Sequence, residues 1–536
     1  MVILRNEGSC WSAGWCDQRS FVPQDDQGRA LFSPVRRMNW DRRAQRRSYA
    51  RPLFSTLVTD TGLLVVTAAS LLASALFITF AILRHRTYHS AAMDFAFFDQ
   101  IVWNTSQGRW FETSFVPYNF MGQHVEPVLL LFAGLYWLTP APEWMLIVQA
   151  LAACGAAIVL YLLARERIER AWLAALIAMS YLLSPTLHDA LAFDYHSEVM
   201  APLFVFGGML LLLRGRTVWG VALLLGMLLL KEDAALVLIG LALPLWLLRE
   251  RRAAMTVAVV GVAWVVLVVG LLMPAVRGGE SDLEARYSHL GEGTGAGGIA
   301  RGLVVNPVGA TGHVLSRWPA HGLFRQLVPQ GGISMLAPLW LLSAAPVALL
   351  QFLSSHDTQQ QLRLQYGAQV LPLVMLATVE GFRWLERASG DHANRSLPIL
   401  ARMESRTQLT APLRKAVFVF VVCTLASAAW YSPVHRLAET RVTATDPATA
   451  QAAFARIPAE ASVSAQSGLA PHLSQREQIW EFPVLNDAEY VILDTHGPVS
   501  RPYWAIHDAE VAALPERGYD LVWSEGSLRI YERNAP

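Results

Sequence analysis

The sequence predicts an all-α polytopic membrane protein of about 11 transmembrane helices, followed by a small C-terminal α/β domain outside the membrane. Hydrophobic residues make up 54% and charged residues 16% of the 536 residues, whereas soluble domains carry roughly 45–50% and about 25%. Apolar blocks recur that reach the length of about 20 residues needed to cross a bilayer. Residues 433–536 lack such blocks, and their hydrophobic runs have the length of strands.

The first apolar block runs from Gly62 to Leu83 without a charged residue. It is too long for the core of a signal peptide and many similar blocks follow, so we expect an uncleaved first helix. The further candidate spans are approximately 144–164, 171–187, 199–213, 217–231, 233–248, 254–275, 322–337, 338–353, 365–382 and 414–432.

Arginine sets the orientation, because cytoplasmic loops hold an excess of basic residues. Seven arginines between 36 and 51 precede the first span, which places the N-terminus in the cytoplasm. The basic loop 383–415 also falls inside if 322–353 crosses twice. The predicted organisation is a disordered cytoplasmic tail (1–52), a transmembrane domain (53–432) with outer loops at 84–143 and 276–321, and an extracytoplasmic domain (433–536). The expected location is the cytoplasmic (inner) membrane.

The C-terminal domain is predicted from alternating element types. Strand-length runs occur at 461–465, 490–494 and 521–524, and 449–457 has the pattern of a helix. This combination predicts an α/β domain.

Charge and cysteine content exclude two classes of function. The chain has two lysines, Lys231 and Lys415, and a net charge of +1, which argues against a nucleic-acid partner. The four cysteines lie at spacings that match neither a zinc site nor a disulfide framework.

The predicted topology places acidic residues and histidines on the outer face, opposite the arginines. Orientation signals alone account for such a division, but an outward-facing polar site is equally compatible, because ionisable groups at membrane depth are costly and usually functional. These outer residues include Asp94, Asp99, His124, Glu126, Asp189, Asp194, His196, Glu198, Lys231, Glu232, Asp233, Glu284, His289 and His356.

Four short motifs stand out in these outer segments: Asp94 to Asn104, His124 to Pro127, Phe193 to Glu198, and Lys231 to Asp233. Together they resemble a bacterial and archaeal membrane-protein family known only as domain of unknown function 2079. The likeness extends over roughly residues 60–495 and includes the segment 461–476 of the outer domain. The first outer loop is also similar to that of the GT-C superfamily of polyprenyl-phosphate-dependent glycosyltransferases.

The GT-C resemblance implies a GT-C-like fold and a general base near the start of the first outer loop, a place that Asp94 holds, with Asp99 as the second candidate. Neighbouring phenylalanines would raise the pKa of such a carboxylate and make it a more useful base. The structural alternative is a carboxylate that binds backbone N–H groups at a helix start. Many GT-C members carry adjacent paired acids, whereas these two are five positions apart, which argues against joint metal coordination.

The same resemblance implies a donor lipid phosphate, whose anion needs a cation at the outer surface. Lys231 is the first candidate, followed by Arg286 and Arg363, although Lys231 is equally able to pair with a neighbouring acid. A divalent metal ion is the less favoured interpretation of the remaining groups. The residues expected to line the polar site are His124, Glu126, Asp189, Asp194, His196, Glu198, Glu232 and Asp233.

Three functions therefore stay open at this stage. The first is an integral membrane glycosyltransferase that moves a sugar from a polyprenyl-phosphate donor to an unknown acceptor on the outer face. The second is a non-catalytic GT-C-like scaffold subunit that binds a membrane-protein partner. The third is a transporter or lipid flippase, which predicts charged residues deep inside the spans.

Overall fold

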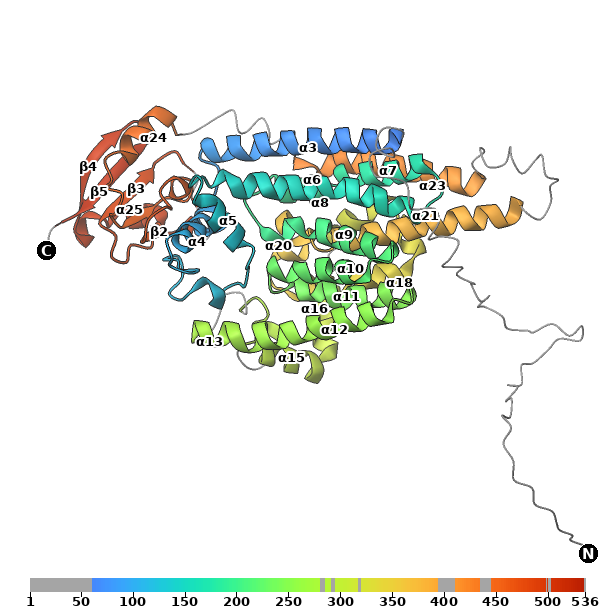
Figure 1. Cartoon of the computed structure of the whole chain (residues 1–536). Coiled ribbons are helices and arrows are strands. Elements are labelled where there is room, and N and C mark those ends of the chain that lie inside the picture. Colours follow the sequence, from blue (N-terminus) through green and yellow to red (C-terminus); the bar gives the residue numbers. More distant parts are fainter. Residues whose placement is uncertain are drawn as a thin grey trace, which may run out of the picture. The chain divides into compact units, whose positions relative to one another are not determined.

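A computed structural model describes residues 60–279, 285–290, 295–316, 320–393, 410–433, 445–497, 499 and 503–534. Within these residues the chain is mostly helical, with one small sheet near the C-terminus (Figure 1). The predicted tail 1–52, and Glu284 of the predicted outer loop, lie outside the described residues.

Four helices of the described part are long and apolar enough to cross a membrane: α3 (Thr61–Arg86), α6 (Glu143–Arg165, continued to Arg167), α12 with η5 and α13 (Arg251–Arg277), and α23 (Ala411–Tyr431). Each contains one predicted span. Helices α3 and α6 pack against each other, as Figure 1 shows. The high apolar content of these segments is confirmed, and the molecule is a membrane protein with several apolar helices.

Two further spans are bent. Helices α7 (Ala171–Leu182) and α8 (Pro185–Leu191) form a pair with an angle of 43°, and the break lies at Pro185. Residues 357–367 and helix α21 (Leu371–Ala393) form a second pair with an angle of 73°. Counting each pair as one span gives up to six among the described residues.

Shorter apolar helices occupy most of the remaining predicted spans. These are η3 with α9 (Ser197–Met200 and Ala201–Leu213), α10 with η4 (Thr217–Leu225 and Gly226–Leu229), α11 (Ala234–Leu247), and α18 to α19 (Pro338–Leu341 and Ala345–Leu353).

The predicted span 322–337 is not one helix. Helix α17 (Ala320–Leu327) gives way to two 3-10 turns, η7 (Val328–Gln330) and η8 (Ile333–Leu336). Gly331 and Gly332, which join the turns, have φ values of +56° and +70°. A left-handed backbone at two successive residues cannot continue a right-handed helix.

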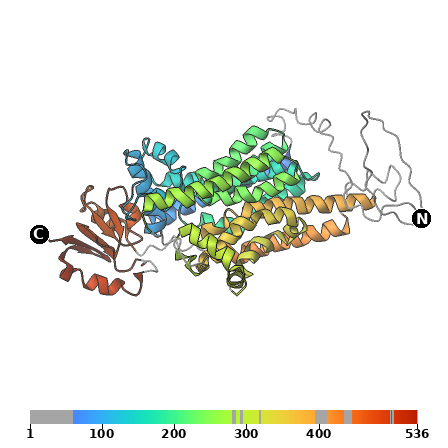
Figure 2. The same ribbon diagram turned by 90° about the horizontal axis from the view of Figure 1, so that it is seen from below.

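The sheet near the C-terminus has the strand order β2-β1-β3-β5-β4. Strand β1 (Val463–Ala465) pairs in parallel with β2 (Ile479–Glu481) and β3 (Tyr490–Asp494), whereas β5 (Leu528–Arg533) is antiparallel to β3 and to β4 (Tyr519–Glu525). Helices α24 (Pro447–Phe454) and α25 (His507–Ala512) complete the element set, which confirms a small α/β unit. Both views show the strands together, beyond one end of the long helices (Figures 1 and 2).

The first loop after α3 joins the sheet to the helices. It contains η1 (Ala92–Ala96), α4 (Phe97–Ser106) and, before α6, α5 (Leu129–Tyr136). The side chain of Gln100 donates to the carbonyls of Arg476 and Glu477, both at 3.0 Å. Ser114 donates to the carbonyl of Ile479 at 2.6 Å. These bonds fix the position of the first loop against the segment that enters β2.

Candidate functional site

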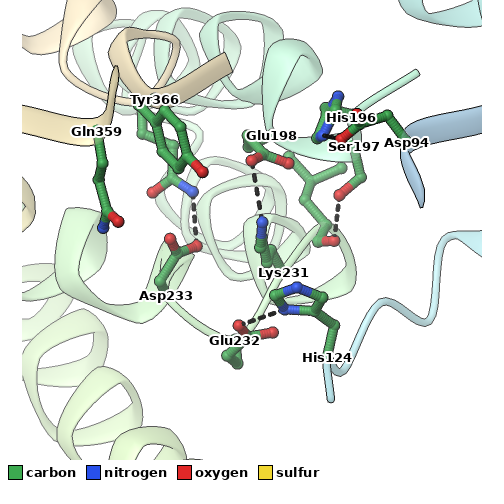
Figure 3. A network of polar contacts seen from close by, with 12 residues as sticks. Asp94, His124, His196, Ser197, Glu198, Lys231, Glu232, Asp233, Gln359 and Tyr366 are labelled. Atoms are coloured by element: carbon green, nitrogen blue, oxygen red, sulfur yellow. Dashed lines mark hydrogen bonds and ion pairs between the residues drawn. The ribbon is translucent and has the colours of Figure 1, made fainter. Parts of the chain in front are cut away.

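A lysine and a glutamate form the centre of a buried polar cluster. Lys231 follows α10 and η4, and Glu198 lies in η3; the Lys231 Nζ is 3.0 Å from Glu198 Oε1 (Figure 3). The two residues are 9% and 4% exposed. In a site with so little water the pair is held tightly, because separating its charges leaves each one desolvated.

The first loop contributes a histidine, a backbone N–H and one acidic side chain to this cluster. His124 Nδ1 lies 2.9 Å from Glu232 Oε1, and the backbone N–H of Val125 donates to Glu232 Oε2 at 3.0 Å. Glu126 lies nearby and is 1% exposed. Burial, followed by the charges of Glu198 and Glu232, raises the pKa of Glu126 well above its ordinary value, against the effect of Lys231.

Asp233 connects the cluster to the C-terminal half of the helical region. Its Oδ1 accepts a hydrogen bond of 2.7 Å from the Gln369 side chain. Burial is the largest cause that raises the pKa of Asp233 to about 7. Lys231 is therefore surrounded by acids from three separate segments, and Figure 3 shows three of these acids, Glu198, Glu232 and Asp233.

A cavity of about 350 Å³ opens beside the cluster. One part of its wall is apolar and comes from α11, η5, α13, α15 (Gly295–Val305) and α19; the other part is polar. The apolar lining residues are Leu236, Val265, Val269, Met273, Ile299, Leu303, Leu350 and Leu353, and the polar ones are His124, Glu198, Lys231, Glu232, Asp233, Arg277, Arg286, Tyr287, Gln351, Gln359, Gln365, Tyr366 and Gln369.

Arg286 also lines this wall, and its hydrogen-bond partners among the described residues are neutral. Its guanidinium donates to the Gln359 amide oxygen at 3.3 Å and to the Tyr366 hydroxyl at 3.2 Å. No carboxylate of the described residues lies within 4.0 Å of it. Its positive charge is therefore available to an anion in the cavity.

Sequence reasoning did not single out Gln359 and Tyr366, which bind Arg286, or Gln369, which binds Asp233. All three lie between α19 and α21; Gln359 was expected in the connection before the predicted span 365–382, and Tyr366 and Gln369 were expected inside that span. The run of glutamines at 359–361, between apolar blocks, is the signal that was available.

Asp94 lies outside the cavity wall but next to the cluster. It belongs to η1, and its Oδ1 is 3.7 Å from His196 Nε2. His196 is two positions before Glu198. Asp94 is therefore linked to the Lys231–Glu198 pair through its contact with His196 and the backbone of residues 196–198 (Figure 3). Burial, followed by the charge of Asp194, raises the pKa of Asp94 to about 7, although 34% of its side chain is exposed.

Asp194 anchors the start of the first loop. Its Oδ2 accepts a bond of 2.9 Å from the N–H of Ala91, and its Oδ1 pairs with Arg84 at the end of α3. The carboxylate thereby satisfies one of the donors that precede η1 and fixes the turn that carries Asp94.

Asp99 lies in a separate environment. It is 1% exposed and accepts from Tyr136 Oη at 2.6 Å, from Gln475 Nε2 at 3.3 Å, and from Ser474 Oγ. Burial raises its pKa to about 6, against the effect of these three donors. The structure therefore places Asp99 where the first loop meets the segment before β2, and does not bring it together with Asp94.

Two more of the predicted site residues also lie away from the cavity. Asp189 pairs with Arg325, and the charge of Arg363 acts on that same arginine. Neither Asp189 nor Arg363 lines the cavity wall.

The possible divalent metal finds no preformed site in the described part of the chain, where no group of three His, Cys, Asp or Glu side chains is suitably arranged. The nearest acids and His124 are already bound to one another or to Lys231. The donor set therefore does not fit a metal ion in this arrangement.

Comparison with solved structures gives distant resemblances. The crystal structure of ArnT from Cupriavidus metallidurans bound to undecaprenyl phosphate is 13% identical, with a TM-score of 0.48, covering 88% of this chain and 99% of that chain. The oligosaccharyltransferase of Archaeoglobus fulgidus, tethered with an acceptor peptide, is also 13% identical, with a TM-score of 0.42, covering 90% and 75%.

No curated protein matches the chain by sequence. The family model described as "Predicted membrane protein (DUF2079)" matches residues 84–520. That match spans the first loop, the polar cluster, the cavity and most of the sheet, which is more than half of the chain. The protein belongs to the DUF2079 family of predicted membrane proteins.

Proposed function

We propose that this protein is an integral membrane glycosyltransferase that moves a sugar from a polyprenyl-phosphate donor to an acceptor on the outer membrane face. The observation that carries the proposal is the two-sided cavity. A lipid phosphate combines an apolar chain with one compact anion, and the cavity combines an aliphatic wall with an arginine whose hydrogen-bond partners among the described residues are neutral.

Arg286 is the first candidate to bind the donor phosphate. Its planar guanidinium suits phosphate oxygens and forms charge-assisted hydrogen bonds with them. Such bonds would also stabilise the phosphate as it leaves the sugar. Lys231 ranks lower because Glu198 already neutralises it at 3.0 Å, and Arg363 ranks lower because it does not line the cavity.

Asp94 is the candidate general base in this reaction. It is partly exposed, whereas Asp99 is buried and bound by three donors. A base with a raised pKa takes a proton more readily from an acceptor hydroxyl. The remaining predicted lining residues, among them Glu232, Asp233 and His124, would position Lys231 and shape the polar end of the cavity.

The test is retention of a polyprenyl phosphate by the purified full chain, measured by native mass spectrometry in detergent. We expect bound undecaprenyl phosphate in the unmodified protein and its loss in Arg286→Gln. Arg363→Gln is the matched control, because it removes an arginine of the same region that does not line the cavity. Equal retention in both variants, or no binding to the unmodified protein, would contradict the proposal and favour a scaffold or a transporter.

A further inference from the structure

Asp94 faces the imidazole of His196, and this contact has a defined geometry. The distance from Asp94 Oδ1 to His196 Nε2 is 3.7 Å, slightly longer than a hydrogen bond. Figure 3 shows the two side chains directed toward each other.

The ring of His196 is held from both sides by aromatic contacts. It stacks on Phe193 with a centroid distance of 5.3 Å and an interplanar angle of 19°. The edge of Phe98 meets it at 5.9 Å and 72°. The backbone N–H of His196 donates to Gln149 Oε1 at 2.7 Å. The imidazole therefore has little freedom to turn away from Asp94.

The second ring nitrogen indicates which tautomer is present. His196 Nδ1 lies 3.5 Å from the backbone carbonyl of Asp194. A carbonyl oxygen only accepts, so this contact is favourable when Nδ1 carries the proton. In a neutral ring Nε2 is then an acceptor, and it is Nε2 that faces Asp94.

We propose that His196 is a positioning residue for Asp94, whose Nε2 accepts a hydrogen bond from the carboxyl group once Asp94 has taken up a proton. A base becomes stronger when its protonated form is stabilised, so this contact would increase the proton affinity of Asp94. This role of His196 rests on the proposed function, in which Asp94 is the general base of the glycosyl transfer.

The proton transfer is balanced. The O–H bond of the acceptor hydroxyl breaks as an O–H bond forms on Asp94, the acceptor oxygen bonds to the anomeric carbon, and the bond from that carbon to the phosphate oxygen breaks. The leaving phosphate keeps the electron pair, and His196 Nε2 accepts a hydrogen bond from the new carboxyl proton. That proton later passes to water.

The surroundings of the pair agree with a neutral imidazole next to a proton-binding carboxylate. Burial lowers the pKa of His196 to about 4 and raises that of Asp94 to about 7. The charged groups that act on Asp94 from the packed elements are Asp194 and Glu481, which raise its pKa, and Arg84 and Arg286, which lower it.

The experiment measures the protonation of Asp94 without any substrate. Dicyclohexylcarbodiimide reacts with protonated carboxyl groups in apolar surroundings, and mass spectrometry of the peptide that contains Asp94 gives the extent of modification. In the unmodified full chain we expect modification to fall with a midpoint near pH 7. In His196→Phe, which keeps an aromatic ring but removes the acceptor, we expect the midpoint to move down by about one pH unit.

His507→Phe is the matched control. His507 is also buried and also meets a phenylalanine edge, at 5.4 Å from Phe482, but it belongs to the sheet region. In His507→Phe we expect the pH midpoint of Asp94 modification to equal that of the unmodified protein. An unchanged or higher midpoint in His196→Phe overturns the inference.

A second measurement covers the case in which His196→Phe does not fold. Solid-state NMR of protein with ¹⁵N-labelled histidine is compared with Asp94→Ala, and the resonance that changes reports His196. A non-protonated Nε2 supports the inference and a protonated Nε2 overturns it. If the unmodified protein retains no polyprenyl phosphate but His196→Phe still lowers the Asp94 midpoint, the proposed function alone is contradicted, so the two failures are distinguishable.

Discussion

The Lys231 ammonium and the Glu198 carboxylate form a buried ion pair of 3.0 Å between two short helices that are distant in sequence. Glu198 starts the chain into α9, and Lys231 precedes the turn into α11. The pair therefore fixes the ends of two apolar helices relative to each other. Glu198 also neutralises Lys231, which the sequence had made the first candidate to bind a phosphate.

Removal of one partner should destabilise the protein more than removal of both. Glu198→Gln leaves the buried Lys231 charge without its carboxylate, which costs about 3–5 kcal/mol in such pairs. The double variant Glu198→Gln with Lys231→Met removes that charge and should recover part of the loss. Thermal unfolding in detergent measures this, and a double variant less stable than Glu198→Gln would show that the pair is not the origin of the effect.

The close approach of α11 to the turn before α19 predicts a second sensitive position. A Cβ atom at Gly240 would lie 1.9 Å from the backbone carbonyl oxygen of Ser343. Because backbone atoms cannot move away cheaply, Gly240→Ala should force these elements apart and cost about 1–3 kcal/mol or more. Folding yield and the unfolding temperature measure the effect.

Gly155→Ala, in α6, is the control for that substitution. No heavy atom lies within 4 Å of the Cβ position at Gly155, and alanine has the higher helix propensity. We expect Gly155→Ala to be neutral or slightly stabilising. Equal behaviour of the two variants would contradict the close packing at Gly240.

The sequence predicted the membrane character and the small α/β unit because both depend on local hydrophobic patterns. It also placed His196, Glu198 and Lys231 among polar residues of one region. It did not distinguish Asp94 from Asp99, because their different environments depend on residues far along the chain: Asp99 meets Ser474 and Gln475, whereas Asp94 meets His196.

Gln100 should determine how firmly the sheet region is held to the first loop. Its amide donates to the carbonyls of Arg476 and Glu477 and accepts from the N–H of Ser114 at 3.0 Å. Gln100→Ala leaves these buried groups without partners, at about 1–3 kcal/mol for each group left unsatisfied. Hydrogen exchange of residues 474–481 should accelerate. Gln107→Ala, an exposed position at the end of α4, should leave that exchange unchanged.

The contact between the first loop and the segment before β2 should also make the free energy of unfolding depend on pH, because it contains Asp99. Its pKa is raised to about 6 in the fold, mainly by burial, whereas an unfolded aspartate titrates near 3.9. A carboxyl group with a raised pKa favours the folded state in its protonated form. That contribution is complete below the unfolded value and is lost as the pH rises through about 6, with a total of at most about 3 kcal/mol.

Asp99→Asn keeps a neutral group of the same shape and should remove this pH dependence. Between pH 5 and pH 8 we expect the unfolding temperature to fall further in the unmodified protein than in Asp99→Asn. The difference between the two proteins isolates Asp99, because other raised groups such as Asp94 and Asp233 are present in both. Parallel pH profiles would contradict this prediction, because they would show that the hydrogen bonds from Tyr136 and Ser474 cancel the effect of burial on the pKa of Asp99.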